Sequence, residues 1–365
     1  MSSVLRSLIA AAVIACGLFA ANVACAQEEG ADTIRKTDGS TVQGKIESED
    51  ASGVKVAVIK GASISIGWNL IKSVDYAGAV ELRKAKGFLD GGQISEAGAV
   101  LEELHKKADL RTILQAHVLN LLGAAYLRNG DSDKAVEVLT ELFTKFPKTQ
   151  FLTKGGGENL VTAYLAKGKP QDADAALEKL STAMKAAGIA QDALSPLRGR
   201  VAEATGNYSS AAAAYNQMLA GAGSDEGVKG AAELGLARCL LGQRKAGEAE
   251  AKYRAIISKD GLPSAVLAGA FNGLGELTYQ AGFAKRDADM LTNALYHYLR
   301  SSVLYAPASG ESTAEYERAI RGSADCFKAL SEVETNAQRK QDNKKRSDER
   351  MSYLATKFPG SSYLK

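Results

Sequence analysis

The stretch AHVLNLLGAAYLRNGDSDKAVEVLTELFTKFPKT, residues 116–149, decides the fold of this chain. Apolar residues recur in it at spacings of three and four, which predicts two helices, at 116–129 and 132–146. Gly130 interrupts the pattern between the helices, and Pro147 ends the second one because its ring cannot continue a helix. The stretch therefore predicts a helical hairpin.

The same arrangement returns along the chain with a period of 38 residues. Small residues recur at Ala97, Ala135, Ala173, Ala211 and Ala249. Larger apolar residues follow four positions later, at Leu101, Leu139, Leu177, Tyr215 and Tyr253. A third set comes three positions after that, at Leu104, Leu142, Leu180, Met218 and Ile256. One hairpin cannot bury its apolar stripe alone, so this fixed period predicts a solenoid of stacked hairpins.

These positions resemble the tetratricopeptide repeat. In the quoted stretch the signature positions of that family are held by Leu122-Gly123, Tyr126, Ala135, Leu139, Leu142 and Pro147. Further copies are expected at 154–187, 192–225, 228–262 and 268–307, with diverged end copies at 78–110 and 314–365. The resemblance implies a mainly α protein, a right-handed α-solenoid of about seven helix hairpins over residues 78–365.

One repeat is longer than the others. The step from Ala249 to Ala294 is 45 residues instead of 38. Because residues 284–291 are rich in charge, we expect the extra residues to form a longer loop between the two helices of that repeat. At the end of the chain, Thr356–Pro359 repeats the phrase Thr144–Pro147, which predicts a last copy that closes the array.

The resemblance also implies a binding surface. In such arrays the first helices line a concave face, which binds protein or peptide partners. The candidate groove residues are His117, Asn120, Arg128, Glu158, Thr162, Arg200, Glu203, Asn272, Glu276, Tyr279 and Gln280. Their charges are mixed in sign. Glu158 and Thr162 stand where a set of Lys, Asn and Arg would be needed to hold a C-terminal carboxylate, so a co-chaperone of that type is disfavoured.

Residues 31–76 have a different composition, in which Thr, Val, Ile, Ser and Gly alternate between apolar and polar positions. Strands are expected at 32–37, 41–48, 54–58, 63–67 and 72–76, with a 3₁₀ turn at 68–71. Asp38-Gly39 predicts a tight hairpin between the first two strands. Five short strands in this space predict a small closed or nearly closed β-barrel.

This β-module is similar to Sm-like and SH3-like barrels. The spacing of the first Sm-like motif is matched by Ile34, Asp38-Gly39, Val42, Gly44, Ile46 and Asp50. The second motif of that family belongs between the last two strands, but its counterpart Ile59-Lys60-Gly61 follows the third strand here. This departure disfavours RNA binding. Trp68, the only Trp, either fills the barrel core or stacks on a ligand.

The N-terminus has the pattern of an export signal. Arg6 is the only charge in residues 1–26, an apolar run covers Leu8–Ala21, and Ala24–Ala26 offers the small residues that signal peptidase accepts. We expect cleavage after Ala26 and export, with the periplasm as the expected compartment and no integral membrane segment remaining. The residues before Cys16 also resemble a lipobox, so a lipid anchor there and an uncleaved anchor are alternatives.

The composition excludes several functional classes. The formal net charge is +3 over 365 residues, which offers nucleic acid no strongly basic surface. The three His are isolated, and no motif of a catalytic, phosphate-binding or metal site is present, so we expect no enzyme activity, no cofactor and no metal. Beyond the signal only Cys239 and Cys326 remain, and we expect both to be buried and unpaired.

The sequence therefore predicts an exported, non-enzymatic scaffold or adaptor that binds partner proteins or peptides in the groove of its helical array. The β-module would then be a second contact site or a cap over the first hairpin. The alternative is an envelope protein that binds a ligand or glycan through the β-module and Trp68. The sequence does not define the oligomeric state.

Overall fold

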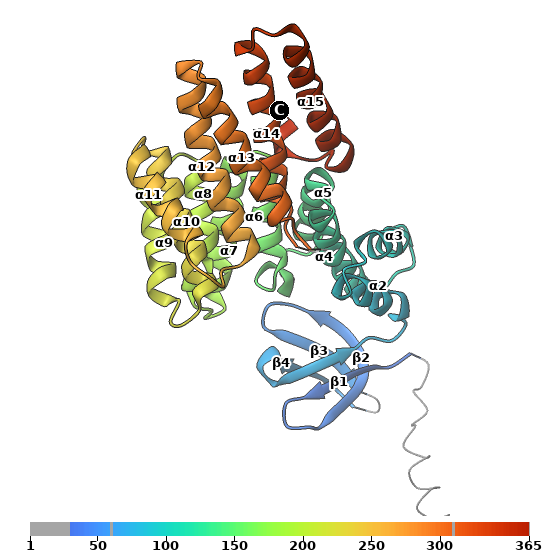
Figure 1. The fold of residues 1–365 in the computed structure, drawn as a ribbon. Coiled ribbons are helices and arrows are strands. Elements are labelled where there is room, and N and C mark those ends of the chain that lie inside the picture. The colour runs from blue at the N-terminus through green and yellow to red at the C-terminus, as the bar shows by residue number, and fades with distance from the viewer. Residues whose placement is uncertain (1–29, 59–60, 309–310, 365) are drawn as a thin grey trace, which may run out of the picture. The chain divides into compact units, whose positions relative to one another are not determined.

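The computed structural model describes residues 30–58, 61–308 and 311–364. The predicted export signal at 1–26, with Cys16 inside it, and Lys60 of the displaced Sm-like motif lie outside these residues. The chain divides into a strand unit that ends at Val80 and a helical unit that begins at Glu81, and Figure 1 shows the elements of both.

The strand unit is one antiparallel sheet of five strands. The strands are β1 Asp32–Lys36, β2 Thr41–Glu49, β3 Gly53–Val58, β4 Ser63–Gly67 and β5 Ile71–Asp75, with a 3₁₀ turn, η2, at Trp68–Leu70. Hydrogen-bonded neighbours follow the order β4–β3–β2–β1–β5. The five predicted strands are confirmed, whereas closure of the sheet into a barrel stays a prediction.

Two glycines of this sheet are needed for different reasons. Gly39 has a φ of +85°, a conformation that other residues adopt at a cost, and it closes the hairpin between β1 and β2. At Gly44 the limit is space, because a Cβ built there would lie 2.2 Å from the carbonyl oxygen of Ala57. Gly44 therefore lets β2 and β3 approach closely.

The sheet buries an apolar core together with one acid. The core residues are Ile34, Ile46, Val54, Val56 and Ile66. The buried Asp32 carboxylate accepts the N–H groups of Ile46 at 2.7 Å and Ala77 at 2.8 Å, so it joins β2 to the end of the unit. Trp68 is half-buried and does not belong to this fully buried core, so both of its predicted roles stay predictions.

The helical unit contains fourteen helices, α2–α15, within the residues that the structure describes. The first three pairs are α2 Val80–Asp90 with α3 Ile94–His105, α4 Thr112–Arg128 with α5 Ser132–Lys145, and α6 Gly156–Ala166 with α7 Pro170–Ala186. The next two are α8 Ser195–Ala204 with α9 Tyr208–Gly221, and α10 Glu226–Gly242 with α11 Ala246–Ile257. The last two are α12 Ser264–Lys285 with α13 Ala288–Leu304, and α14 Ala314–Val333 with α15 Ala337–Lys357. These seven pairs confirm the predicted helical array.

The two helices of a pair meet through small residues. Ala135, Ala173 and Ala211, at equivalent positions, are each completely buried. On the partner helix a glycine often faces a large side chain. A Cβ built at Gly199 would lie 2.5 Å from the ring of Tyr215. The 38-residue period therefore reflects a repeated contact between helices, as the sequence predicts.

Most first helices end in the same hydrogen-bonded turn. In this turn one residue adopts the left-handed conformation. The backbone N–H of the next residue donates a hydrogen bond of 2.8–2.9 Å to the carbonyl of the residue five positions before that donor. The left-handed residues are Gly92, Gly130, Gly168, Gly206, Arg244 and Arg286. Glycine adopts this conformation without cost, but an arginine is destabilised there by about 1 kcal/mol. Arg244 and Arg286 thus depart from the preferred residue of this turn.

The long repeat does not contain the expected loop. Arg286 follows Arg244 by 42 residues instead of the usual 38, so α12 gains four residues. Ala294 follows Arg286 by eight residues, whereas Ala249 follows Arg244 by five, so three more residues lie before Ala294. The seven extra residues therefore lengthen α12 and the start of α13. The expectation of a longer loop is wrong because residues 284–285 and 288–291, with the charged Lys285 and Asp289 among them, continue these helices.

The C-terminal segment after α15 folds back onto the second helix pair. The hydroxyl of Ser132 donates to the carbonyl of Gly360 at 3.3 Å. A Cβ at Gly360 would lie 2.3 Å from the carbonyl oxygen of Gly130, so only glycine fits this approach. Arg321 on α14 donates to the carbonyl of Tyr363 at 2.6 Å and fixes the other end of the segment.

Candidate functional site

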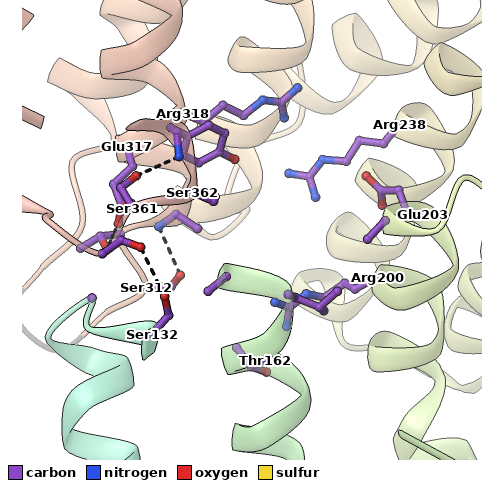
Figure 2. Close-up of a pocket in the computed structure, with 18 of the residues that line it drawn as sticks. Ser132, Thr162, Arg200, Glu203, Arg238, Ser312, Glu317, Arg318, Ser361 and Ser362 are labelled. Atoms are coloured by element: carbon purple, nitrogen blue, oxygen red, sulfur yellow. Dashed lines mark hydrogen bonds between the residues drawn. The ribbon is translucent and has the colours of Figure 1, made fainter. Parts of the chain in front are cut away.

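The first helices of successive pairs line one cavity of about 850 Å³ (Figure 2). Four side chains on its wall stand at intervals of 38 residues: Thr162 on α6, Arg200 on α8, Arg238 on α10 and Glu276 on α12. Because the hairpins stack in register, equivalent positions face the same space. The helical period thus builds a polar wall with one residue from each repeat.

The far side of the cavity comes from the end of the chain. Glu311–Ala314, Glu317 and Arg318 contribute from the start of α14 and the residues before it. The folded-back segment Gly360–Tyr363 also lines the cavity, as do Gly130 and Ser132, which it contacts. We call this cavity, walled by α4, α6, α8, α10, α12 and the C-terminal segment, the trough.

Six of the eleven groove candidates lie on the wall of the trough. They are Arg128, Thr162, Arg200, Glu203, Glu276 and Gln280. They come from α4, α6, α8 and α12. The first helices therefore bring residues that are far apart in sequence to one inner face, as predicted. A role for these residues in binding stays a prediction.

The other five candidates lie elsewhere. His117 packs edge-on against Phe151, with 4.7 Å between ring centroids, and Glu158 is exposed in the first turn of α6. Asn120 is half-buried, and Tyr279 stacks on the neighbouring Phe283. A place on a first helix is therefore not enough to put a side chain on the wall of the trough.

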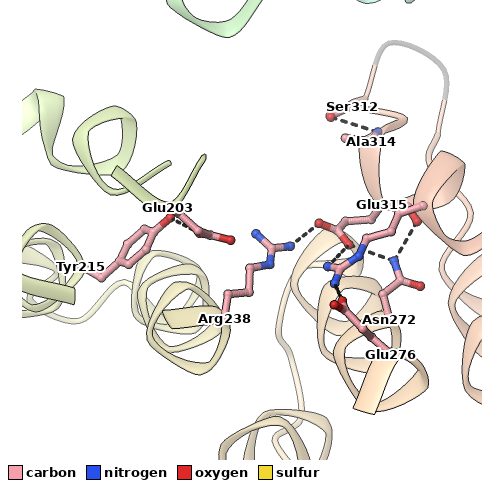
Figure 3. Close-up of polar contacts among 9 residues, drawn as sticks. Glu203, Tyr215, Arg238, Asn272, Glu276, Ser312, Ala314 and Glu315 are labelled. Atoms are coloured by element: carbon pink, nitrogen blue, oxygen red, sulfur yellow. Dashed lines mark hydrogen bonds and ion pairs between the residues drawn. The ribbon is translucent and has the colours of Figure 1, made fainter. Parts of the chain in front are cut away.

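Asn272, the remaining candidate, is fully buried in a network of charges (Figure 3). Its side-chain amide donates to the carbonyl and the carboxylate of Glu315, at 2.8 and 2.9 Å. Arg238 forms an ion pair with the same carboxylate, and Arg318 bridges Glu315 and Glu276. The network joins α10, α12 and α14, and its members Arg238, Glu276 and Arg318 also line the trough.

The pKa of Glu315 follows from this surrounding. Burial alone would raise the pKa of this carboxyl group, but Arg238, Arg318 and the amide of Asn272 together hold the pKa below its ordinary value. The carboxylate therefore stays charged, which keeps both guanidinium groups in place. This arrangement holds α10, α12 and α14 together and fixes Arg238 and Glu276 in place on the wall of the trough.

The acids on the trough wall all have hydrogen-bond donors. Tyr215 donates to Glu203 at 2.9 Å, and Arg318 donates to Glu276. Glu311 accepts the N–H of Ala308 at 2.9 Å, and Glu317 accepts the hydroxyl of Thr313 at 2.6 Å. Burial raises the pKa of Tyr215 well above its ordinary value, so its hydroxyl remains a donor.

The arginines of the trough divide into two groups. Arg128 donates to the carbonyl of Leu89 at 2.9 Å, and Arg238 and Arg318 belong to the charge network. Arg200 and Arg244 are exposed, and neither has a hydrogen bond or an ion pair among the described residues. Arg238 and Arg244 are not among the residues predicted to line the groove. The 38-residue step from Arg200 would have found Arg238, and the step from Gly206 would have found Arg244.

Arg200 stands in an electrostatic position that favours an anion. Although Arg200 is exposed to solvent as a residue, the surrounding helices partly desolvate its guanidinium group and lower the pKa of that group. The charge of Arg238 lowers this pKa further, whereas Tyr215 and Glu203 act in the opposite direction. An arginine remains charged in spite of such a shift. Its positive charge is therefore held in the trough without an ion-pair partner.

Other reactive groups of the described chain are few. Cys239 and Cys326 are buried and free, as predicted, and burial raises the pKa of the Cys239 thiol to about 11. The described residues contain no cluster of three or more His, Cys, Asp and Glu side chains placed to bind a metal. Within the same residues, no helix has both the length and the apolar character to cross a membrane.

Comparison with sequence families identifies the repeats. Profiles of the tetratricopeptide repeat match residues 121–149 and 197–265. No curated protein matches the chain in sequence. The helical unit thus contains tetratricopeptide repeats, as the resemblance implies.

Solved structures share the helical fold at low identity. NprR in complex with its cognate peptide NprX is 17% identical, with a TM-score of 0.50, over 78% of this chain and 80% of that chain. The apo form of the quorum sensor NprR from B. thuringiensis is 16% identical, with a TM-score of 0.46, over 78% of each chain. A tetratricopeptide repeat protein from Parabacteroides merdae is 18% identical, with a TM-score of 0.45, over 73% of this chain and 97% of that chain.

Proposed function

We propose that this protein is an exported, non-enzymatic scaffold that binds a partner protein or peptide in the trough. The observation that carries the proposal is the polar wall built from one position in each of four repeats, Thr162, Arg200, Arg238 and Glu276. A row of polar groups at regular intervals suits an extended chain, whose own polar groups also recur at regular intervals.

The dimensions of the trough support this function. A volume of about 850 Å³ lies within the range of binding sites for small ligands and short segments, which is roughly 300–1,000 Å³. NprR has the same fold and is solved with a cognate peptide, which shows that such an array can hold one. The catalytic residue sets that mark hydrolases or kinases are not among the sequence motifs of this chain.

The test introduces a bulky side chain into the trough and measures whether the partner still binds. Thr162→Trp places a bulky side chain on the half-buried wall of α6, and Thr140→Trp places the same side chain on the exposed surface of α5. Proteins captured from the native envelope by the wild type and by Thr140→Trp, but lost with Thr162→Trp, would support the proposal. Equal capture by both variants, or consistent turnover of a small molecule, would contradict it.

Export is proposed on the pattern of residues 1–26 and is tested separately. Cell fractionation should place the protein in the periplasm, and N-terminal sequencing of the purified protein should begin at Gln27. A lipid on Cys16 would instead place the protein in the membrane fraction and begin the mature chain at Cys16. Recovery from the cytoplasm with an intact N-terminus would overturn the proposal.

The β-module offers a second candidate function, the binding of a ligand or glycan. The observation that favours it is the half-buried Trp68, because a Trp outside the core keeps part of its indole available for stacking. Trp68→Ala in the full chain should then abolish capture of the partner or glycan while Thr162→Trp has no effect. The reverse result assigns partner binding to the trough.

A further inference from the structure

We propose that the trough recognises an acidic segment of its partner, with a carboxylate of an extended peptide bound by Arg200 and Arg244. The inference rests on the proposed function and names the chemistry of the partner. It depends on three features of the trough: its surplus of free cations, the backbone of Arg244 and the contrast with Arg286.

The first feature is the distribution of charge. Every acid on the wall of the trough already accepts a hydrogen bond from the protein. Arg200 and Arg244 face the same cavity, and neither has a hydrogen bond or ion pair in the described part of the chain. An anion that enters the trough therefore finds two guanidinium groups without an internal partner, whereas each carboxylate on the wall already has a hydrogen-bond donor.

The second feature is the conformation of Arg244. It has a φ of +62° at the turn where four other repeats have glycine. The arginine is thus held in an unfavourable backbone conformation, yet its side chain forms no hydrogen bond or ion pair with the described residues that would offset this cost. Binding of a ligand by the Arg244 side chain at the wall of the cavity would explain why an arginine occupies this unfavourable conformation.

The third feature is a comparison within the chain. Arg286 has the same left-handed conformation, with a φ of +54°, but lies outside the trough. Its guanidinium donates to the carbonyl of Glu332 at 3.2 Å, so a contact within the protein accounts for it. No such contact accounts for Arg244, which leaves the trough as the place where its charge acts.

The chemistry of the ligand follows from the guanidinium group. Its planar fork donates two parallel hydrogen bonds to a carboxylate. The neighbouring acids would repel a ligand with several clustered charges, so one or two carboxylates on an extended segment fit best. The carboxylate can come from an acidic side chain or from a C-terminus, and both present the same chemistry to Arg200 and Arg244.

The experiment uses the full mature chain and a random heptapeptide library made by messenger-RNA display. Peptides enriched by the wild type should carry Asp or Glu at a preferred position, and the best peptide is then synthesised with a fluorophore for affinity measurements. Arg200→Gln and Arg244→Gly should each weaken its binding roughly 10- to 100-fold, the loss expected for a hydrogen bond between charged groups.

The controls separate binding from folding. Arg286→Gly makes the same backbone change outside the trough and should leave the affinity unchanged. Arg244→Gly places the preferred residue in the turn, so it should fold at least as well as the wild type. Weaker binding by this variant would therefore reflect the lost guanidinium, and unchanged binding would overturn the proposal.

The form of the peptide identifies the source of the carboxylate. Replacing its acidic residue by Gln should remove binding if a side chain is recognised, and amidation of its C-terminus should remove binding if the terminus is recognised. Loss with either change supports the proposal, and loss with neither overturns it. Peptides without acids that Thr162→Trp no longer binds would contradict this inference alone, whereas no enrichment at all would contradict the proposed function too.

Discussion

Single residues maintain the spacing between helices in this array, and Tyr215 is the clearest case. Its ring lies between Gly199 on α8 and Gly235 on α10, and a Cβ at either position would lie 2.5 Å from it. The tyrosine is 4% exposed and its hydroxyl is bound to Glu203, so it cannot move aside. One aromatic side chain therefore sets how closely two repeats approach.

Gly199→Ala should destabilise the protein by about 2 kcal/mol, because the added methyl group overlaps a ring that is fixed on both sides. Chemical denaturation followed by far-UV circular dichroism measures this change. Gly98→Ala is the matched control, since nothing lies within 4 Å of a Cβ on that helical glycine. The control should stabilise the protein by about 0.5–1 kcal/mol, and an equal loss in both variants would refute the explanation.

Glu315 determines the response of the charge network to acid. Since the pKa of its carboxyl is held below the ordinary 4.5, the folded state binds this proton less readily than the unfolded state. Its contribution to stability is thus complete above the ordinary pKa and disappears as the pH falls through the lowered pKa. Glu315→Gln should cost about 2 kcal/mol at pH 7, because Arg238 and Arg318 lose a charged partner.

Urea unfolding at pH 7 and at pH 3 tests this prediction. The difference between wild type and Glu315→Gln should be clear at pH 7 and smaller at pH 3. Asp90→Asn removes the exposed ion pair with Lys86 and should change stability by less than about 0.5 kcal/mol at either pH. A difference between wild type and Glu315→Gln that is the same at both values would show that the charge of Glu315 is not the cause.

At the scale of helices, the period of the sequence predicted which segments pair and roughly where each turn lies. The turn residues Gly130, Gly168 and Gly206 carried that information, because glycine interrupts a helical pattern visibly. Arg286 did not, since arginine is a good helix former and leaves no visible break in the pattern. The charged residues within 284–291 indicated a long loop instead, whereas only Arg286 and Asp287 lie between the two helices. Helix propensity depends on the residue and its close neighbours in sequence, whereas the left-handed conformation of Arg286 is imposed by the packing of two helices.

Arg244→Gly should raise the free energy of unfolding by about 0.5–1 kcal/mol, because glycine relieves the left-handed strain but adds freedom to the unfolded chain. The reverse change, Gly206→Arg, should lower it by a similar amount. A Cβ at Gly206 would meet nothing within 4 Å, so only the backbone conformation is penalised. Thermal and urea unfolding of both variants measure the effect, and changes of equal sign would contradict it.

For the helical unit as a whole, the sequence predicted the array of helix pairs but not the contact of its C-terminal segment with the second pair. The tracks of small and large residues describe contacts between helices that are close in sequence, as with Leu139 of α5 and Gly123 of α4. The contact of Ser132 with Gly360 joins residues 228 positions apart and leaves no periodic trace. The same reason explains the trough: its first-helix wall was partly predicted, whereas the wall formed by the C-terminal segment was not.

Gly360→Ala tests the closure. Its methyl group would meet the backbone of Gly130, which has no flexible side chain to displace, so the C-terminal segment should detach. Hydrogen exchange should then accelerate in residues 130–132 and 360–364 and stay unchanged in α8–α11. Gly221→Ala, with nothing within 4 Å of its Cβ, serves as the control. Unchanged exchange near residue 360 would show that the segment is held by other contacts.

The contact between Gly360 and Gly130 also has a consequence during synthesis. Joining two points so distant along the chain carries a large entropic cost until the intervening repeats have folded. Gly360 leaves the ribosome after all seven helix pairs of the array, so the contact forms after everything it rests on. A nascent chain therefore has an uncovered inner surface, and a molecule that meets it at that stage encounters a wider opening than the finished protein presents.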